Sequence, residues 1–212
     1  MHTLVLVDDD PAVRDIFSTF LKKSEYQVHV VSGGKECLDL LKTTVPDLLL
    51  LDIMMEPMDG WETLNAIKKN PATRTIPVIM LTGKQPTYNE IIHYGGWVED
   101  YMMKPMDFKT LEQSLATFFE RDSQMHRHVG QLQKEGFDPV LIREYYQLAR
   151  ISAIIEHIRQ HLGKIWRLND ADYRIRKERL HQLQVTLRLP VFGQGTDRQA
   201  ENKPSDNGAN DA

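Results

Sequence analysis

Short, mainly apolar runs alternate with amphipathic segments over residues 1–122, and this alternation restricts the fold more than any other feature of the sequence. The five runs span residues 4–7, 28–31, 48–51, 76–81 and 101–103. The segments between them carry apolar side chains three or four residues apart, which is helical spacing. Continuous apolar strands are typical of parallel sheets that connecting helices bury on both faces. We therefore predict an α/β fold with a doubly wound, five-stranded parallel sheet.

The pattern changes after this region and becomes helical over long stretches from about residue 138. Six apolar residues then follow at intervals of 3-4-3-4-3: Leu148, Ile151, Ile155, Ile158, Leu162 and Ile165. This heptad seam is typical of a helical hairpin or coiled coil. A second helix is predicted from about residue 171, after a break near Leu168. We expect the seam to pack against a further partner, either a second copy of the chain or the first domain.

These patterns divide the chain into four parts. Residues 1–122 form the α/β domain, residues 123–137 a linker and residues 138–189 the helical module, whereas the polar residues 190–212 are predicted to be disordered. The charge follows the same division, because residues 1–122 hold 12 Lys+Arg and 19 Asp+Glu, and residues 123–212 hold 14 and 11. The overall net charge of −4 is therefore the sum of an acidic part and a mildly basic part.

The composition excludes several classes of protein. The single cysteine, Cys37, excludes a disulfide scaffold and a Cys-rich zinc site. The sequence has no run of about 18 apolar residues, so a transmembrane helix and a membrane partner are not expected. Its first residues lack the basic start and the cleavage site of a signal peptide, which predicts a cytoplasmic protein.

Acidic residues follow two of the predicted strands. Asp8, Asp9 and Asp10 come directly after the first run, and Asp52 directly follows the third. In the flavodoxin-like strand order these two strands are neighbours, so their carboxyl ends meet. Carboxylates gathered there repel one another unless a hard cation lies among them, and Mg²⁺ prefers such oxygen ligands. Asp10 precedes a proline and is better interpreted as the cap of the next helix.

Two further strands end in residues that suit the same chemistry. Thr82 offers a hydroxyl group after the fourth run, and Lys104 offers an ammonium group after the fifth. Together with the acids and Mg²⁺, these groups suit the transfer of a phosphoryl group onto Asp52, because the cation and Lys104 would neutralise charge on the phosphoryl oxygens.

The motifs that carry this site make the first domain recognisable. Residues 1–122 closely resemble the receiver domain of two-component response regulators. The matching stretches are Val7-Asp8-Asp9-Asp10, Pro46-Asp47 leading into Asp52, Asp59-Gly60, Leu81-Thr82-Gly83 and Asp100-Tyr101-Met102-Met103-Lys104-Pro105. The region from Tyr146 to Leu183 is only weakly similar to the HalX-type helical segments that follow some archaeal receivers.

The resemblance implies a role for each residue of the acceptor and metal site. Asp52 matches the phospho-acceptor, and Asp8 and Asp9 match the acidic pair that binds Mg²⁺. Asp9 matches the direct ligand, whereas Asp8 acts partly through water. The backbone carbonyl of Met54 matches the third protein ligand.

The resemblance also implies a switch. Thr82 matches the hydroxyl that moves toward the phosphoryl group, and Lys104 matches the lysine that pairs with it. Tyr101 matches the aromatic residue that turns inward on phosphorylation. The bond between Lys104 and Pro105 is expected to be cis.

The sequence departs from the family pattern in two places. The family usually has proline four residues after the acceptor, where this chain has Glu56 followed by Pro57. The extra carboxylate of Glu56 would alter the site or face solvent, and we favour solvent. Gly83 follows Thr82 where the family often has alanine, which adds freedom to the loop.

We therefore expect a response regulator of a two-component phosphorelay, which is a signalling protein and not an enzyme. It would accept a phosphoryl group from a histidine kinase on Asp52 and switch a helical module that contacts a partner or forms a homodimer. One alternative is a DNA-binding transcription regulator, although no helix-turn-helix pattern favours it. Another is a phosphotransfer enzyme resembling the haloacid dehalogenase family, but Met54 stands where that class has a second aspartate.

Overall fold

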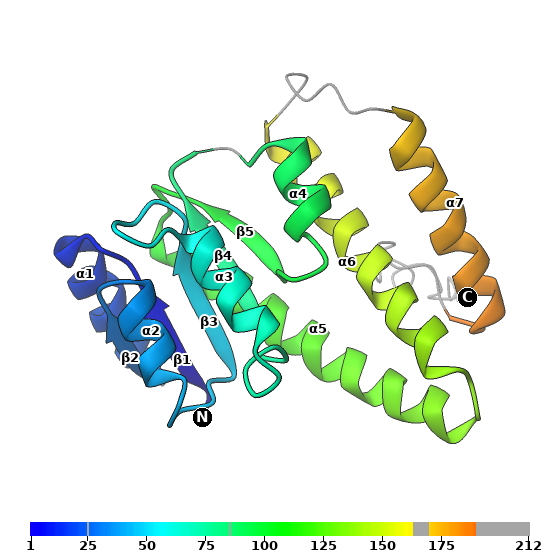
Figure 1. The fold of residues 1–212 in the computed structure, drawn as a ribbon, viewed down its shortest axis with the longest axis horizontal. Helices are drawn as coiled ribbons and strands as arrows, with labels where there is room; N and C mark the ends of the chain where they lie inside the picture. The colour runs from blue at the N-terminus through cyan, green and yellow to red at the C-terminus, as the bar shows by residue number, and fades with distance from the viewer. Residues whose placement is uncertain (25, 85, 163–169, 190–212) are drawn as a thin grey trace, which may run out of the picture.

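A computed structural model describes residues 1–24, 26–84, 86–162 and 170–189 (Figure 1). The predicted helix break near Leu168 and the predicted disordered tail, residues 190–212, lie outside these ranges.

Five parallel strands form one sheet. They are β1 (Thr3–Val7), β2 (Gln27–Val31), β3 (Leu48–Asp52), β4 (Val78–Thr82) and β5 (Asp100–Met103). Their order is β2-β1-β3-β4-β5, and the register pairs Leu4 with Leu48 and Asp52 with Leu81. The predicted doubly wound, flavodoxin-like fold is therefore confirmed, and the chain reverses its direction of winding between β1 and β3.

Five helices of the first part cover both faces of this sheet. They are α1 (Pro11–Lys23), α2 (Gly34–Leu40), α3 (Gly60–Lys69), α4 (Tyr88–Tyr94) and α5 (Phe108–Lys134). The helices α1 and α5 share one core cluster with Leu48 and Leu50, whereas α2, α3 and α4 share the other with Leu49 and Leu51. Successive side chains of a strand point to opposite faces, so β3 must be apolar at every position between two helical layers.

The last helix of the first part continues past the predicted domain boundary. The helix α5 is 27 residues long and includes residues 123–134, most of the predicted linker. After it the chain turns at Gly136, whose φ of 83° is a conformation that favours glycine. Asp138 then accepts a hydrogen bond from the backbone N–H of Val140 and caps the next helix. The connection is therefore mainly helical, and the boundary at residue 122 stays a prediction.

Two long helices follow, α6 (Pro139–Leu162) and α7 (Asp170–Thr186). They pack together through a cluster that includes Ile142, Tyr145 and Leu183. A bidentate ion pair joins them, with Arg179 donating to both carboxylate oxygens of Glu144 at 2.7 and 2.8 Å. In Figure 1, α5 projects from the sheet and α6 returns beside α4 and α5.

Part of the heptad seam of α6 meets the first domain, while the side chains of Ile158, Leu162 and Ile165 lie outside the part of the chain that the structure describes. Ile151 and Ile155 of the seam, with Ile154 beside them, belong to the same buried cluster as Ile91 of α4. Of the two partners expected for the seam, the contact with the first domain is therefore present in the structure. None of the described helices is long and apolar enough to cross a membrane.

The buried Cys37 allows a test of this core. Its side chain is fully buried in the α2 layer, and burial raises the pKa of its thiol to about 12. Because thiols react as thiolates, we expect no reaction of the native protein with Ellman's reagent at pH 8 and one equivalent of reaction in denaturant. Fast, complete reaction of the native protein would contradict the packing of α2.

Candidate functional site

Three carboxylates meet at the carboxyl ends of β1 and β3. Asp8 and Asp9 directly follow β1, and Asp52 ends β3, which pairs with β1. Asp8 and Asp52 are buried, whereas Asp9 is exposed. One carboxylate oxygen from each residue lies within 4.8 Å of the others. The structure thus brings together the three acids that the sequence analysis singles out.

The Lys104 ammonium group lies between two of these acids. Its Nζ atom is 2.5 Å from Oδ2 of Asp8 and 3.0 Å from Oδ2 of Asp52. Burial raises the pKa of Asp8, and the bonds from Lys104 only partly offset this rise. Burial also works to lower the pKa of Lys104, but its hydrogen bonds to Asp8 and Asp52 outweigh this effect and raise that pKa. The charged form of Lys104 is therefore stabilised by its hydrogen bonds to Asp8 and Asp52.

The donor set fits a magnesium ion. Three carboxylates and the ammonium group of Lys104 leave two negative charges, which one divalent cation would balance. Carboxylate and backbone carbonyl oxygens are also the ligands that Mg²⁺ prefers. The backbone carbonyl of Met54 is a candidate ligand, since Met54 lies on the loop after β3 and its N–H donates to Oδ1 of Asp52 at 3.3 Å.

The hydroxyl group of Thr82 is bonded to its own loop. Thr82 is fully buried at the end of β4. Its Oγ1 atom donates to the carbonyl of Lys84 at 2.6 Å and accepts from the N–H of Lys84 at 3.0 Å. Any interaction between this hydroxyl and a group on Asp52 would require the bond to the Lys84 carbonyl to break.

A cleft of about 580 Å³ opens beside the acids, and Asp9, Met54 and Thr82 are among the residues that line it. Glu56 also lines the cleft, although its side chain is exposed as expected. Sequence reasoning did not assign Trp61 or Glu90 to the site, yet both line this cleft. Trp61 and Glu90 stand at ordinary positions on α3 and α4, so the sequence around them carries no signal of a site.

The Asp59-Gly60 pair positions the end of β3. Asp59 caps α3 by accepting from the N–H of Glu62, and Glu62 accepts from the N–H of Asp59, which completes a capping box. Gly60 donates its N–H to the carbonyl of Ile53 at 3.0 Å. A Cβ atom on Gly60 would lie only 2.1 Å from the backbone oxygen of Asp52. The start of α3 can therefore approach the acceptor strand only without a side chain at this position.

Tyr101 is already buried in the structure. Its side chain is 3% exposed, and its ring lies 6.1 Å from that of Trp61. Its hydroxyl has no hydrogen-bond partner among the described residues, and burial raises its pKa well above the usual value. The resemblance implies that this ring turns inward on phosphorylation. In the structure the ring is inward and packs in the cluster that also contains Trp61.

The comparisons with known proteins agree with this geometry. The profile of the response regulator receiver domain matches residues 4–116, which is more than half of the chain. The chain belongs to the response regulator receiver family. A crystal structure of a CheY-like receiver domain protein from Methanospirillum hungatei is 36% identical, with a TM-score of 0.51, and the match covers 57% of this chain and 97% of that one.

Two curated relatives extend the comparison. A Vibrio cholerae protein named "Probable cyclic di-GMP phosphodiesterase" is 36% identical over 118 residues, which cover 56% of this chain and 26% of that protein. The response regulator Rre1 of Synechocystis is 29% identical over 162 residues, which cover 76% of this chain and 66% of that protein. The chain therefore spans between about a quarter and two thirds of these relatives. The receiver profile ends within α5, so it does not characterise α6 and α7.

The resemblance implies a cis bond between Lys104 and Pro105, and this bond is cis in the structure. The bond between Glu56 and Pro57, where the sequence departs from the family pattern, is also cis.

The close approach at Gly60 predicts a clear mutational effect. In Gly60→Ala the new methyl group meets backbone atoms of Asp52, so β3 or α3 must shift. We expect a loss of about 1–3 kcal/mol in the free energy of unfolding, as for other overpacked sites, together with weaker Mg²⁺ binding. Urea unfolding and Mg²⁺ titration would measure both.

Gly83→Ala is the matched control, because nothing lies within 4 Å of a Cβ atom at that position. It should unfold at nearly the same urea concentration as the unmodified protein. Equal stability of Gly60→Ala and Gly83→Ala would contradict the close approach of α3 to β3.

Proposed function

We propose that the protein is a response regulator whose Asp52 accepts a phosphoryl group from a histidine kinase with the help of Mg²⁺. The observation that carries this proposal is the buried Asp52 carboxylate within reach of Asp8, Asp9 and the Lys104 ammonium group. Asp8, Asp9, Asp52 and the backbone carbonyl of Met54 would hold the Mg²⁺ ion. Membership of the receiver family supports the same assignment.

The residues of the site suit this transfer. A carboxylate oxygen of Asp52 attacks phosphorus, the P–N bond of the kinase phosphohistidine breaks, and the histidine nitrogen keeps the electron pair. Lys104, 3.0 Å from Asp52, is placed to neutralise charge on the phosphoryl oxygens. Bound Mg²⁺ supplies further charge neutralisation. Thr82 would exchange its bond to the Lys84 carbonyl for one to a phosphoryl oxygen.

The other parts of the proposal concern the rest of the chain. We infer that it is a signalling protein and not an enzyme, that it acts in the cytoplasm, and that α6 and α7 pass the signal on to a protein partner. On α7, Arg179 is bonded to Glu144 and Lys177 lies 5.1 Å from the ring centre of Tyr173. Because both cations already have contacts within α6 and α7, these two residues do not favour DNA as the partner.

The acceptor can be tested with a small phosphodonor. We expect Asp52→Asn to abolish labelling by acetyl phosphate, because an amide nitrogen and oxygen cannot form the acyl phosphate. Asp10→Asn is the matched control: Asp10 is exposed and caps α1 through the N–H of Ala12, and asparagine can keep this cap. Undiminished labelling of Asp52→Asn, measured by intact mass under acidic conditions, would sink the assignment.

The metal site has a built-in optical probe in Trp61, which lines the acceptor cleft. Mg²⁺ should change tryptophan fluorescence with a saturable titration, and EDTA should reverse the change and prevent labelling. In Asp9→Asn the charge of one oxygen ligand is lost, so the titration midpoint should rise at least about tenfold, because changing even an outer-shell partner of a ligand typically has an effect of this size. A midpoint that did not move would show that Asp9 is not a ligand.

A further inference from the structure

A groove of about 680 Å³ lies at the edge of the sheet opposite the acceptor site. Its wall includes Pro77, just before β4, and Glu99, just before β5, together with residues of α5 and α6. The strands are parallel, so these positions mark their amino ends, whereas Asp52 stands at the carboxyl end of β3. The groove is therefore separate from the carboxyl edge, where open α/β sheets usually bind ligands.

The charges that line this groove are mainly positive. Its wall contains four cations and two carboxylates, which leaves an excess of two positive charges: Lys68, Arg74, Arg143 and Arg150 against Glu99 and Asp122. The acceptor cleft has the opposite balance, with four carboxylates and a single lysine in its wall. The first domain is acidic as a whole, so the positive groove is a local arrangement and not a consequence of composition.

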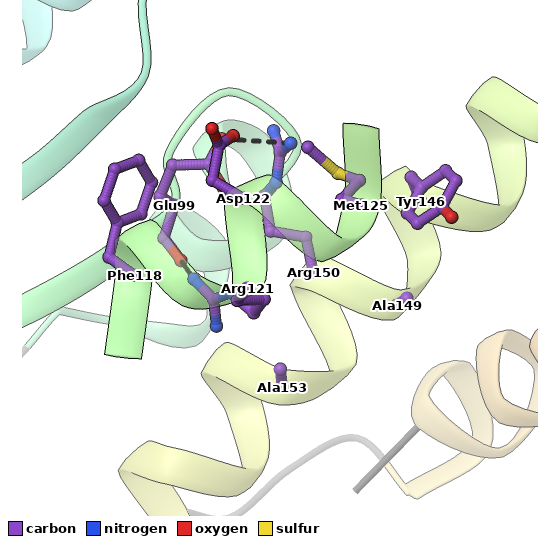
Figure 2. Close-up of a pocket in the computed structure, with 9 residues that line it drawn as sticks. All are labelled: Glu99, Phe118, Arg121, Asp122, Met125, Tyr146, Ala149, Arg150 and Ala153. Carbon is purple, nitrogen blue, oxygen red and sulfur yellow. Dashed lines mark hydrogen bonds and ion pairs between the residues drawn. The ribbon is translucent and has the colours of Figure 1, made fainter. Parts of the chain in front are cut away.

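One cation and one carboxylate of the groove already neutralise each other. Figure 2 shows Arg150 of α6 reaching Glu99, with Nη2 of Arg150 3.0 Å from Oε1 of Glu99. Arg150 also donates to the carbonyl of Gly96 at 3.3 Å, and Arg121 of α5 donates to the carbonyl of Glu99 at 3.1 Å. These bonds join α5 and α6 to the segment before β5, so they hold the wall of the groove in place.

The ammonium group of Lys68, in the last turn of α3, has no such partner. Its Nζ atom donates to the backbone carbonyls of Ile76 at 2.6 Å and Arg74 at 3.2 Å, but it forms no ion pair with any residue that the structure describes. Two of its three N–H groups are thus used, and one is left for a ligand. Burial lowers the pKa of Lys68 to about 8, with Glu99 working against this shift and Arg150 adding to it. A sheltered charge without a counter-ion is costly, and a bound anion would remove that cost.

Two guanidinium groups of the groove are also available. Arg74 lies between α3 and β4, and Arg143 lies on α6; both side chains are exposed. Neither guanidinium group forms a hydrogen bond or an ion pair within the described ranges of the chain. Each can therefore turn toward an anion without giving up a bond. A guanidinium group presents its N–H donors in a plane that suits bidentate binding of phosphate oxygens.

We propose that this groove is a binding site for a small organic phosphate, held by Lys68 and by the guanidinium groups of Arg74 and Arg143. A phosphate monoester carries a charge of about −1.5 to −2 near neutral pH, which balances the excess of two positive charges. A monocarboxylate would balance only half of that excess.

The groove has room for the organic part of such a ligand. Its volume of about 680 Å³ falls within the range of small-molecule pockets, roughly 300–1,000 Å³. The half-buried Trp97 in the wall offers apolar surface. The site does not depend on phosphorylation of Asp52, because the two lie at opposite edges of the sheet.

The first experiment measures binding of phenyl phosphate and of inorganic phosphate to the full chain by calorimetry. The buffer is metal-free, because Mg²⁺ would carry phosphates to the acceptor cleft. We expect saturable binding at one site, with phenyl phosphate binding more tightly if the organic part contacts the wall and inorganic phosphate binding as tightly if only the phosphate group is recognised; either order supports a phosphate site. Binding of neither probe, or tighter binding of citrate than of both, would overturn the inference.

The double variant Arg74→Gln with Arg143→Gln tests the two guanidinium groups. We expect it to fold normally, because these side chains have no bonds within the described residues, and to bind phenyl phosphate at least about tenfold more weakly. Arg127→Gln is the matched control: Arg127 is exposed on α5 and does not line the groove, so its loss should leave the affinity nearly unchanged. Equal affinities of the double variant and the control would contradict the site.

The pH dependence tests Lys68. Its free amine has a pKa of about 8, so phenyl phosphate should bind several-fold more weakly at pH 9 than at pH 7.5, where Lys68 is mainly charged. This loss should disappear in Lys68→Gln and persist in Lys69→Gln, which removes an exposed neighbouring charge. The other ionisable groups of the wall are of types that ordinarily titrate outside this range: Glu99, Asp122, His126, Arg143, Tyr146 and Arg150. The same pH profile in both variants would show that Lys68 does not bind the anion.

These readouts are independent of the proposed function. Asp52→Asn should bind phenyl phosphate as the unmodified protein does, because Asp52 is not part of the groove wall. A failure of acetyl phosphate labelling would therefore leave the groove assignment intact. Loss of phenyl phosphate binding in Asp52→Asn would place the anion in the acceptor cleft and contradict the inference. If Lys68→Gln does not fold, the double arginine variant still decides the test.

Discussion

The repulsion among Asp8, Asp9 and Asp52 is the constraint on which the rest of the structure depends. Three carboxylate oxygens within 4.8 Å are tolerated because Lys104 reaches two of these acids and a cation can balance the remainder. The sheet supplies this arrangement, since β1, β3 and β5 end at the same edge. The close approach of Gly60 to β3 and the buried Thr82 keep the site compact. The fold therefore maintains a local electrostatic cost that a bound divalent cation would relieve.

Much of the receiver domain could be predicted from the sequence, because its signals are local. The central strands β1 and β3 are almost entirely apolar, and acids stand at or just after their carboxyl ends, so the topology brings Asp8 and Asp52 together. The cleft positions of Glu90 and Trp61 could not be predicted, since they depend on how α3 and α4 are set against the sheet.

The heptad seam shows the limit of a periodic pattern. Apolar residues at 3-4 spacing specify that one face of a helix is buried, but they do not specify what buries it. The same seam suits a second chain, a neighbouring helix or the receiver surface. Here Ile151 and Ile155 are covered by the receiver domain, and α6 also packs on α7. A pattern that resembles a dimer interface can thus be satisfied within one chain.

The length of the continuous helix α5 determines how α6 and α7 can move relative to the sheet. Its 27 residues span roughly 40 Å at 1.5 Å per residue, so the far end of the helix is held at a fixed distance from the sheet. The chain turns just beyond it, at Gly136, where nothing lies within 4 Å of a Cβ position. If α6 and α7 left the receiver surface, they would therefore pivot about this distal turn. The isoleucine face of α6 would then be turned outward.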